Sequence, residues 1–515
     1  MSSPPKEYTG SMLRPMLVGL FVMSGALLFG IDSGELGGFM AMTPFLEDYG
    51  TYDAATKTYG IAANTQTALG GLVIAGCVVA SFVAGYVGNR YGRRIGLCCT
   101  GLLGIVGVLL QVTSTRIAAL YIGRIFSGAS IGFASNFVTV YNGEVAPAHL
   151  RGILIGLYQT GINVGQVIGV CINQGTHALA TRWAYRIPLL TQLIFPVVLC
   201  FLVWFLPESP RWLMTRDRPE KAARSLRRLR GPQYGDNRID DEIRDLAMHI
   251  QVERQLMETS EGASAWDAMT AIFRGTDARR THIACGCVTW QVLSGISFIN
   301  SYGTYFFSVS GISNAFVISI IVQVCQLAGI IAMFPSVRWF GRRTILLWGG
   351  ALQTVCMFTF AIVGTAAPGS TAAAHCLVAF TCLFGFFFTW SWGPVAWIVT
   401  SEVASNTLRS RTQGLATACT WTGTLVLQIV LPYLINADAA DLGAKVGFIF
   451  GPLSLMGFVW AFFYLPETKG RSLEELDEMF ANKVSVRDFA TYQCVGVALQ
   501  DDKTNVSVVH IEKDA

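Results

Sequence analysis

Two side chains of opposite charge stand inside long apolar runs of this sequence. Asp32 lies in a run over about residues 13–42, and Arg124 lies in another over about residues 118–141. An ionised side chain at the centre of a bilayer costs about 2.5–3.5 kcal/mol on insertion scales, so few chains retain one without a use. We expect the two groups to pair between helices, and a proton on Asp32 would release Arg124. The alternative is a fixed ion pair that joins two helices.

A second carboxyl follows one helical turn later. Glu35 is three residues beyond Asp32, so the two side chains lie on the same face of a helix. Glu35 is either a second acid in the same proton pathway or a group that faces an outer vestibule. Asp32, Arg124 and Glu35 together form the predicted proton-coupling group.

The helices that must position these charges are those of a membrane protein. The chain has 515 residues, of which 52% are hydrophobic and 14% are charged, and its mean hydropathy is +0.48. Soluble proteins carry about 25% charged residues. A helix needs about 20 apolar residues to cross a bilayer. Twelve such runs are centred near Ala26, Ala75, Gly107, Ser130, Val164, Pro196, Phe298, Cys325, Cys356, Gly385, Leu425 and Gly457. The sequence therefore predicts an all-α membrane protein with twelve transmembrane helices.

The basic residues mark one side of the membrane. Lys and Arg gather in alternate loops, at 90–94, 151, 211–280, 338–343 and 409–411, and the loops between these contain few of them. The positive-inside rule then places both termini and the long central loop in the cytosol. A net charge of +4 is too small to indicate binding to nucleic acid.

Three charged landmarks recur at an offset of about 250–260 residues, which predicts two similar halves. The repeated segments are Gly92-Arg93-Arg94 and Gly341-Arg342-Arg343, Glu144 with Arg151 and Glu402 with Arg409, and Pro207-Glu208-Ser209 and Pro466-Glu467-Thr468. We expect a cytosolic N-terminal segment (1–12), two six-helix halves (13–206 and 281–465), a cytosolic helical linker (207–280) and a cytosolic tail (466–515). Repeats of this kind place a solute near the bilayer midplane, between the halves.

The same landmarks predict a gate at the cytosolic mouth. Charged residues of one half would face those of the other and close the mouth by ion pairs. The candidates are Arg93, Arg94, Glu144, Arg151 and Glu208 in the first half, and Arg342, Arg343, Glu402, Arg409 and Glu467 in the second. Each exposed pair is worth about 0–1 kcal/mol, which suits contacts that break in every transport cycle.

These landmarks resemble the sugar porter branch of the major facilitator superfamily over nearly the whole chain. The matching segments are Phe29-Gly30-Ile31-Asp32-Ser33-Gly34, Gly123-Arg124, Pro207-Glu208-Ser209-Pro210-Arg211-Trp212-Leu213, Gly393-Pro394-Val395-Ala396-Trp397 and Pro466-Glu467-Thr468-Lys469-Gly470. The segment Thr304-Tyr305-Phe306-Phe307 is similar to fungal members, particularly the maltose or α-glucoside type. The resemblance implies a sugar–proton symporter in the plasma membrane, with Asp32 as its proton site and Arg124 as the partner.

A polyhydroxylated solute needs amide, hydroxyl and aromatic partners in a pocket that is otherwise apolar. The fifth apolar run offers Gln159 and Gln166, which are seven residues apart and share one helical face. Further candidates are Gln291, Ser297, Asn300, Tyr302 and Tyr305 in the seventh run, and Trp392 in the tenth, beside a break expected at Gly393-Pro394. The alternative is that these polar groups only pair between helices.

The resemblance refines this set of candidate solute contacts. It places Gln159, Gln166, Gln291 and Trp392 on sugar-binding positions, and Trp421 is also retained. The chain departs from the family at Val292, Ser297, Thr420 and Thr424, where the family has amides, and at Asn89 and Arg338, where the gate motif has an acid. The pocket is therefore less rich in amides than a standard glucose site. Hexoses, disaccharides, polyols and other polyhydroxylated solutes all remain open.

The predicted function is secondary active transport of a sugar-like solute by alternating access, with proton symport. The alternatives are a downhill facilitator, a nutrient sensor and a solute exporter; sensors of this family carry a longer tail than this chain. An enzyme is not expected, because no phosphate loop, nucleophile elbow or zinc-helix motif is present. The thirteen cysteines show no metal-ligand spacing, so we expect no metal and no cofactor, and we expect a monomer.

Overall fold

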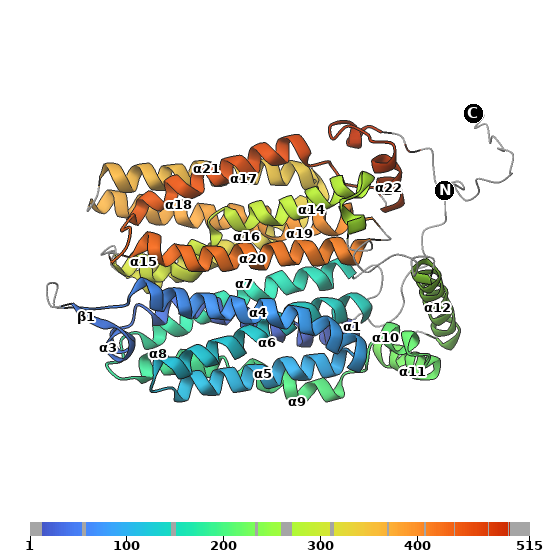
Figure 1. Cartoon of the computed structure of the whole chain (residues 1–515), viewed down its shortest axis with the longest axis horizontal. Coiled ribbons are helices and arrows are strands. Elements are labelled where there is room, and N and C mark those ends of the chain that lie inside the picture. The colour runs from blue at the N-terminus through green and yellow to red at the C-terminus, as the bar shows by residue number, and fades with distance from the viewer. Residues whose placement is uncertain are drawn as a thin grey trace.

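The computed structural model describes residues 13–494, apart from 54–57, 146–150, 232–234, 259–269, 310–313, 368–369, 406–407, 437, 472 and 493. Long helices run side by side along one axis and form two bundles, one from each part of the chain (Figure 1). Within the described residues, eleven helical segments are long and apolar enough to cross a membrane. The fold is that of a membrane protein with two six-helix halves.

The first half occupies the lower part of Figure 1. Its helices are α1 (Leu13–Val22), α2 (Ser24–Phe39), α3 (Thr43–Tyr49), α4 (Ala63–Tyr91), α5 (Arg93–Thr113), α6 (Ile117–Val145), α7 (Arg151–Thr176), α8 (Trp183–Thr191), α9 (Ile194–Leu202) and η1 (Val203–Phe205). A short antiparallel hairpin of β1 (Thr51–Asp53) and β2 (Thr58–Gly60) follows α3. Helix α7 is the fifth predicted span. Its 26 residues reach about 39 Å at 1.5 Å per residue, which is enough to cross the hydrocarbon core.

The second half lies above the first in Figure 1. Its elements are α14 (Gly275–Leu293), η4 (Phe298–Tyr302), α15 (Gly303–Val309), α16 (Ala315–Phe340), α17 (Arg342–Ala366), α18 (Thr371–Trp390), α19 (Trp392–Val403), α20 (Arg409–Ile435), η5 (Gly443–Val446) and α21 (Gly447–Tyr464). The two halves meet where α4 packs against α20 and where α7 packs against α16.

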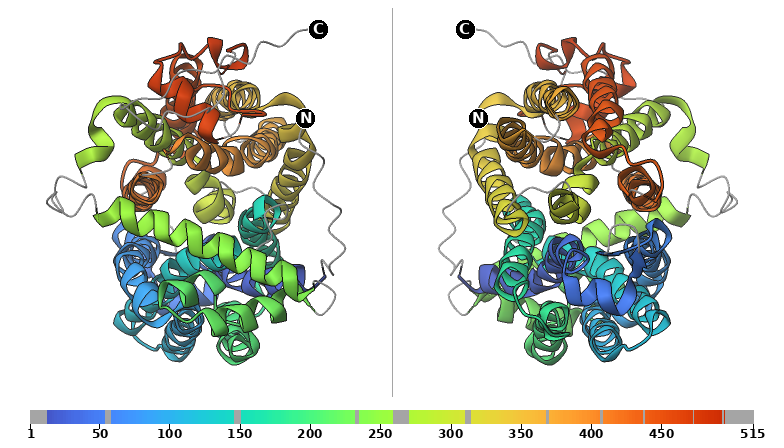
Figure 2. Two further views of the ribbon diagram at one scale, coloured as in Figure 1. Left: turned by 90° about the vertical axis from the view of Figure 1, so that its right-hand side faces the viewer. Right: turned by 90° about the vertical axis from the view of Figure 1, so that its left-hand side faces the viewer.

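Further helices stand outside the two bundles at one end. The segment that joins the two halves in the sequence forms α10 (Pro210–Thr215), α11 (Pro219–Arg230), α12 (Asp236–Glu258) and η3 (Ala271–Phe273). The segment that follows the second half forms α22 (Leu473–Ala481) and η6 (Asp488–Ala490). Figure 2 shows α12 lying across this end of the first half. We call this end of the molecule the linker end, and the opposite end, which carries β1, β2 and α3, the hairpin end.

Close helix packing in the first half depends on glycine. The ideal Cβ position of Gly128 on α6 lies 1.9 Å from the carbonyl oxygen of Val73 on α4. A methyl group there would overlap the neighbouring backbone, so only glycine permits this helix–helix distance. Small residues allow such approach in membrane bundles, where lipid is as apolar as the side chains.

Several spans are interrupted, and the interruptions have local causes. Helix α8 ends at Thr191 and α9 begins at Ile194, because Pro196 has no N–H to donate to the carbonyl of Gln192. Gly295 separates α14 from η4 and has a φ of +98°, which favours glycine.

The break expected at Gly393-Pro394 lies instead at Ser391, between α18 and α19. Pro394 is accommodated in the first turn of α19, where backbone N–H groups have no helical partner. The hydroxyl of Ser391 donates to the carbonyl oxygen of Phe387 at 2.6 Å and so closes the end of α18.

Candidate functional site

The predicted charge pair is present in the interior of the first half. Arg124 Nη1 on α6 donates to Asp32 Oδ1 on α2 at 2.5 Å, and the two residues are 0% and 3% exposed. Arg124 Nε donates to the carbonyl oxygen of Leu69 on α4 at 3.0 Å. The pair therefore ties three helices together. Arg124 Nη2 is buried and has no hydrogen-bond partner among the described residues.

Glu35 lies beside this pair and is completely buried. It does not face a vestibule in this structure. Gln192 Nε2 donates to Glu35 Oε2 at 2.7 Å, and the hydroxyl of Thr191 lies 3.2 Å from Glu35 Oε1. Both partners lie at the interruption between α8 and α9, so the kink caused by Pro196 places an amide and a hydroxyl next to the carboxyl group.

The two candidate glutamines of α7 differ in their surroundings. Gln166 is buried, and its Nε2 donates to the hydroxyl of Ser33 on α2 at 3.3 Å. Gln159 is half-buried, two turns closer to the linker end. The backbone carbonyl oxygen of Gln159 accepts a hydrogen bond from Asn163 Nδ2 at 3.0 Å. Gln166 thus lies close to Asp32, because Asp32 directly precedes Ser33 on α2.

The candidates of the second half make buried contacts with backbone carbonyls. Gln291 Nε2 on α14 donates to the carbonyl oxygen of Gly393 at 2.6 Å. Trp392 Nε1 on α19 donates to the carbonyl oxygen of Leu346 on α17 at 2.9 Å. Because Gly393 and Trp392 follow the interruption at Ser391 directly, the structure brings these two candidates together at one broken helix.

Around η4, Asn300 Oδ1 accepts from Gln326 Nε2 of α16 at 2.8 Å, and Tyr302 is fully buried. Its hydroxyl lies 3.4 Å from the carbonyl oxygen of Gln428 on α20, to which it donates. Tyr305 on α15 is also buried, and Ser297 is half-buried immediately before η4.

The three candidates on α20 are half-buried. The hydroxyls of Thr420 and Thr424 donate to carbonyls of their own helix, at Ala416 and Thr420, over 3.0 and 2.8 Å. These threonines therefore hold their hydrogens within α20 and offer a solute mainly acceptor oxygens. Trp421 instead reaches across to the first half, where its ring packs against Phe29 with centroids 5.9 Å apart.

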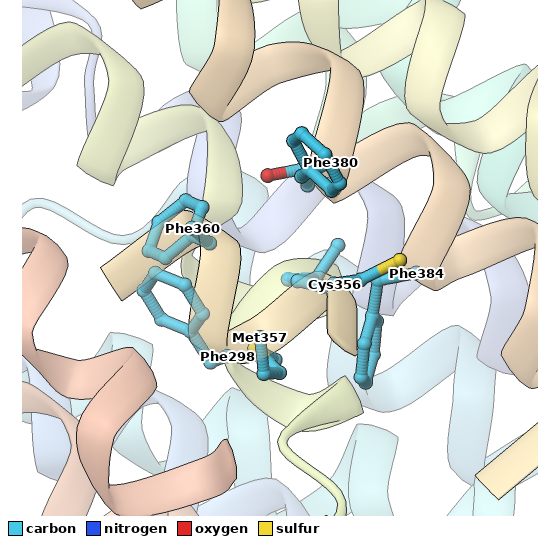
Figure 3. Close-up of a pocket in the computed structure, with 8 residues that line it drawn as sticks. Phe298, Cys356, Met357, Phe360, Phe380 and Phe384 are labelled. Carbon is cyan, nitrogen blue, oxygen red and sulfur yellow. The ribbon is translucent and has the colours of Figure 1, made fainter. Parts of the chain in front are cut away.

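Two small pockets occur near these residues. One lies between η4, α17 and α18, and Figure 3 shows the aromatic side chains that surround it; its lining is Phe298, Ile299, Cys356, Met357, Phe360, Phe380, Thr381 and Phe384. Thr381, its only polar side chain, donates to the carbonyl of Leu377, so this pocket does not suit a sugar. The second joins Val170 of α7 to Asn300, Thr304, Ser319 and Gln323 of the second half. It is more polar and lies between the halves.

Within the described residues, the ion pairs that the structure gives for the gate residues Arg93 and Arg342 lie within one half, not between the halves as the sequence predicted. Arg93 binds Glu144 through Nε at 2.9 Å and Nη2 at 2.7 Å. In the second half, Arg342 Nη2 binds Glu402 Oε1 at 2.8 Å. The physical reason is geometric: each arginine begins a helix beside the end of the helix that carries its acid.

Glu208 and Glu467 occupy equivalent positions as caps of helix N-termini. Glu208 accepts from the backbone N–H of Arg93 at 3.0 Å and of Arg94 at 3.3 Å. Glu467 accepts from the N–H of Arg342 at 2.9 Å and of Arg343 at 3.1 Å. A carboxylate at a helix N-terminus satisfies free N–H groups and complements the helix dipole. Burial raises the pKa of Glu208, against the opposing effect of these hydrogen bonds.

The remaining gate candidates have other partners. Arg94 Nη2 donates to the carbonyl oxygen of Trp204 at 2.6 Å, and Arg343 Nη2 donates to that of Phe462 at 2.9 Å. Both therefore bind the end of the sixth span of their own half, where carbonyls lack helical partners. Arg409 begins α20 and is half-buried, whereas the side chain of Arg151, at the start of α7, lies outside the described residues.

Contacts between the halves occur at the hairpin end. The N–H of Ala63 donates to Asp438 Oδ2 at 3.0 Å, and Asn436 Nδ2 donates to the carbonyl oxygen of Ile61 at 3.3 Å. The hydroxyl of Thr67 donates to the carbonyl oxygen of Ile429 at 3.1 Å. The halves are therefore joined at the hairpin end, while the ion pairs described above at the linker end stay within one half.

Some polar residues next to these sites were not predicted from the sequence. They are Ser33, Thr191, Gln192, Gln323 and Gln326. A usable signal existed for the last two, because two glutamines one helical turn apart are unusual in an apolar run. For Thr191 and Gln192 the sequence signal was weaker. Pro196 turns them toward Glu35 by interrupting the backbone of the span, and the sequence does not show the direction of that turn.

The fold and the buried polar site define a membrane transporter. The family model described as "Sugar (and other) transporter" matches residues 18–480. The chain belongs to this sugar transporter family of the major facilitator superfamily, and it is not an enzyme.

Relatives of known name span most of the chain. A major facilitator-type transporter of Aspergillus rugulosus is 32% identical over 96% of this chain and 92% of its own. A probable glucose transporter of Neurospora crassa is 34% identical over 92% of this chain and 81% of its own. A high glucose sensor of Saccharomyces cerevisiae is 31% identical over 91% of this chain and 61% of its own.

The fold is similar to that of the xylose transporter XylE from E. coli in a partially occluded inward-open conformation. The TM-score is 0.71 at 22% identity, over 89% of this chain and all of XylE. This similarity confirms the twelve-helix architecture predicted from the sequence.

Proposed function

We propose that the chain is a proton symporter that moves a sugar-like solute by alternating access. The observation that carries the proposal is the ion pair of Asp32 and Arg124, buried inside a membrane bundle at 2.5 Å. Two charges in a low-dielectric interior remain there only while paired, and protonation of Asp32 removes one of them. The proton thus decides whether α2 and α6 stay tied together.

The proposed orientation follows from charge. The linker end carries the basic loops, so the positive-inside rule assigns it to the cytosol together with both termini. The proposed membrane is the plasma membrane, which follows from the family resemblance. The bonds between the halves at the hairpin end would then close the outer mouth. In this orientation the structure corresponds to an inward-facing or occluded state of the transport cycle.

The proposed solute site lies between the halves, among Gln166, Gln291, Asn300, Trp392 and Trp421. The glucose-transporter relative supports a sugar as the solute class. The threonines of α20 hold their hydrogens within the helix and so offer fewer donors than the amides that the family has there. This favours no single sugar, and a hexose, a disaccharide and a polyol each fit the donor set.

The experiment that tests the proposal is uptake by transport-deficient cells that express this chain. Labelled monosaccharides, disaccharides and polyols are compared with and without a protonophore. We expect the cells to accumulate the solute against its concentration gradient, and we expect the protonophore to abolish this accumulation. Asp32→Asn should abolish accumulation while leaving exchange of solute, and the matched exposed variant Asp240→Asn on α12 should behave like the wild type.

Each alternative function gives a different result in the same experiment. A downhill facilitator would equilibrate the solute without accumulating it, and the protonophore would have no effect. A sensor would show no flux of any solute in the panel. An exporter would lower the cellular content of the solute. Accumulation by Asp32→Asn equal to that of the wild type would contradict the coupling role of the ion pair.

A further inference from the structure

The hydrogen bonds around Glu35 indicate where a proton lies. The hydroxyl of Thr191 has one hydrogen, and it donates that hydrogen to the carbonyl oxygen of Pro188 at 2.6 Å. The same hydroxyl could instead donate to Glu35 Oε1, which lies 3.2 Å away, but one hydrogen serves one acceptor; while it is on Pro188, the contact with Glu35 is a hydrogen bond only if Glu35 is the donor. The other oxygen, Oε2, accepts from Gln192 Nε2 at 2.7 Å. The pattern matches a neutral carboxylic acid, with one donor and one acceptor oxygen.

Burial leads to the same protonation state. Glu35 is 0% exposed, and Arg124, the charge that could balance it, already binds Asp32. An ionised carboxyl buried without a counter-ion is so costly that the group takes a proton instead. The charged groups that act on Glu35 are Asp32 on its own helix and Arg124 on α6. Helix α7 presents Gly169 and Asn173, and α8 presents Thr191, none of which titrates.

We propose that Glu35 holds a proton in this state, and that Glu35 and Asp32 form a two-carboxyl relay around Arg124. The relay rests on the proposed symport and specifies how the proton reaches Asp32. In the resting arrangement Glu35 is neutral and Asp32 is the carboxylate that balances Arg124. The cluster then carries one proton, one negative charge and one positive charge.

The transfer step conserves these charges. The O–H bond of Glu35 breaks, an O–H bond forms on Asp32, and Glu35 becomes the carboxylate. The Thr191 hydroxyl rotates from Pro188 to donate to Glu35 Oε1, while Gln192 continues to donate to Oε2. Because the same two side chains satisfy both forms of Glu35, the hydrogen bonds around Glu35 adjust to the transfer by the rotation of one hydroxyl. Arg124 is then free of Asp32, and its unpartnered Nη2 can bind another acceptor.

The position of Glu35 gives the relay a direction. Helix α2 runs toward the hairpin end, and three residues of helix correspond to about 4.5 Å. Glu35 therefore lies closer to the hairpin end than Asp32 does. A proton that enters from this side reaches Glu35 first.

The protonation of Glu35 can be measured directly by infrared spectroscopy of the purified full-length protein in lipid. A protonated carboxylic acid has its own C=O stretching band, separate from those of carboxylates. We expect this band at neutral pH in the wild type and its loss in Glu35→Gln. It should also weaken in Asp32→Asn, because Glu35 then supplies the carboxylate that balances Arg124. A band that is absent from the wild type, or unchanged in Asp32→Asn, would overturn the proposal.

Transport by Glu35→Gln tests the relay itself. Glutamine has the size of the neutral acid and keeps a hydrogen-bond donor, but it cannot release a proton. We expect proton-driven accumulation to fall by about tenfold or more, with solute exchange retained. Glu47→Gln, the same change at an exposed position of α3, should have no effect. Wild-type accumulation by Glu35→Gln would overturn the relay.

Thr191→Val provides a second variant in which both carboxyls remain. It removes the hydroxyl that accepts from the acid and donates to the carboxylate, so we expect slower accumulation with the infrared band retained. Unchanged accumulation by Thr191→Val would contradict the proposed transfer step. If the wild type moved no protons with solute, the symport would fail, while the infrared band would still decide the protonation of Glu35.

Discussion

The two halves of the molecule are alike at the linker end and different in their interiors. At the linker end, Glu208 and Glu467 cap equivalent helices, and Arg94 and Arg343 bind equivalent carbonyls. In the interior, the first half has a buried ion pair with a neighbouring acid. The interior of the described part of the second half has amides and an indole that donate to backbone carbonyls, such as Gln291 to Gly393.

This difference suggests a division of labour between the halves. A charged pair responds to a proton, whereas neutral amides recognise hydroxyl groups without regard to pH. Similar linker ends allow both halves to move as rigid bodies against each other. The following predictions test whether the proton chemistry is confined to the first half and solute recognition is centred on the second.

The largest effect is expected from Arg124→Leu. This change leaves Asp32 buried without its cation, and breaking one partner of a buried pair costs about 3–5 kcal/mol. We expect a large fall in the midpoint of thermal unfolding of the purified protein and loss of coupled transport. The double variant Asp32→Leu with Arg124→Leu should regain much of the stability but not the coupling. A double variant no more stable than Arg124→Leu would contradict this account.

The next effect concerns solute affinity in the second half. Gln291→Ala removes an amide that donates to Gly393, beside Trp392. We expect the KM for the solute to rise about tenfold to a hundredfold, since a solute hydroxyl that loses its amide partner in the buried site costs about 1–3 kcal/mol. Proton coupling should persist. The control is Gln353→Ala, a buried glutamine of the same half that donates to Ser391 at 3.2 Å and is not among the solute candidates. Equal effects of the two variants would indicate packing and not recognition.

The sequence was sufficient to predict the elements that depend on hydrophobicity alone. Long apolar runs in a bilayer must form helices, so the number of spans and the two-half fold followed from composition and repeated motifs. The pairing of Asp32 with Arg124 also followed, because the two opposite charges stand alone in separate apolar runs, although Glu35 was a second acid within reach of the same arginine. The functional roles of the site residues remain predictions.

Other features depend on details that a single sequence does not contain. The partners of Glu35 depend on the kink at Pro196, which turns Gln192 inward. The gate acids pair within a half because Arg93 and Arg342 begin helices beside them, a distance set by packing and not by spacing along the chain. The interruption before Trp392 lies at Ser391, since Pro394 fits the first turn of a helix as well as it fits a break.

A smaller effect is expected from pH at the linker end. Burial raises the pKa of Glu208, so its charged form is disfavoured in the folded state. The contribution of Glu208 to stability is therefore greatest below the pKa of this glutamate in the unfolded chain, about 4.5, and is lost as the pH rises through its pKa in the folded protein. Over this range we expect the free energy of unfolding of the wild type to fall by about 1.4 kcal/mol or less for each pH unit by which the folded pKa of Glu208 exceeds the unfolded one. Glu208→Gln should remove this slope from thermal unfolding curves, and the exposed control Glu220→Gln should retain it. A slope unchanged by Glu208→Gln would contradict the prediction.

The smallest effect compares the two equivalent arginines. Arg93 binds both oxygens of Glu144 and also donates to the carbonyl of Gly88 at 2.8 Å. Arg342 binds only one oxygen of Glu402, because Thr468 holds the other at 2.6 Å. Lysine carries the charge but not the planar fork, so Arg93→Lys loses more hydrogen bonds than Arg342→Lys.

We therefore expect Arg93→Lys to lower the stability of the protein by about 1 kcal/mol and Arg342→Lys by about 0.5 kcal/mol or less. Thermal unfolding of both variants in the same lipid measures the difference. The charge at each position is kept, so a difference between them reports the geometry of the pair and not its electrostatics. Equal losses would mean that the linker ends of the two halves are energetically equivalent despite their different contacts. The asymmetry between the halves would then be confined to the interior.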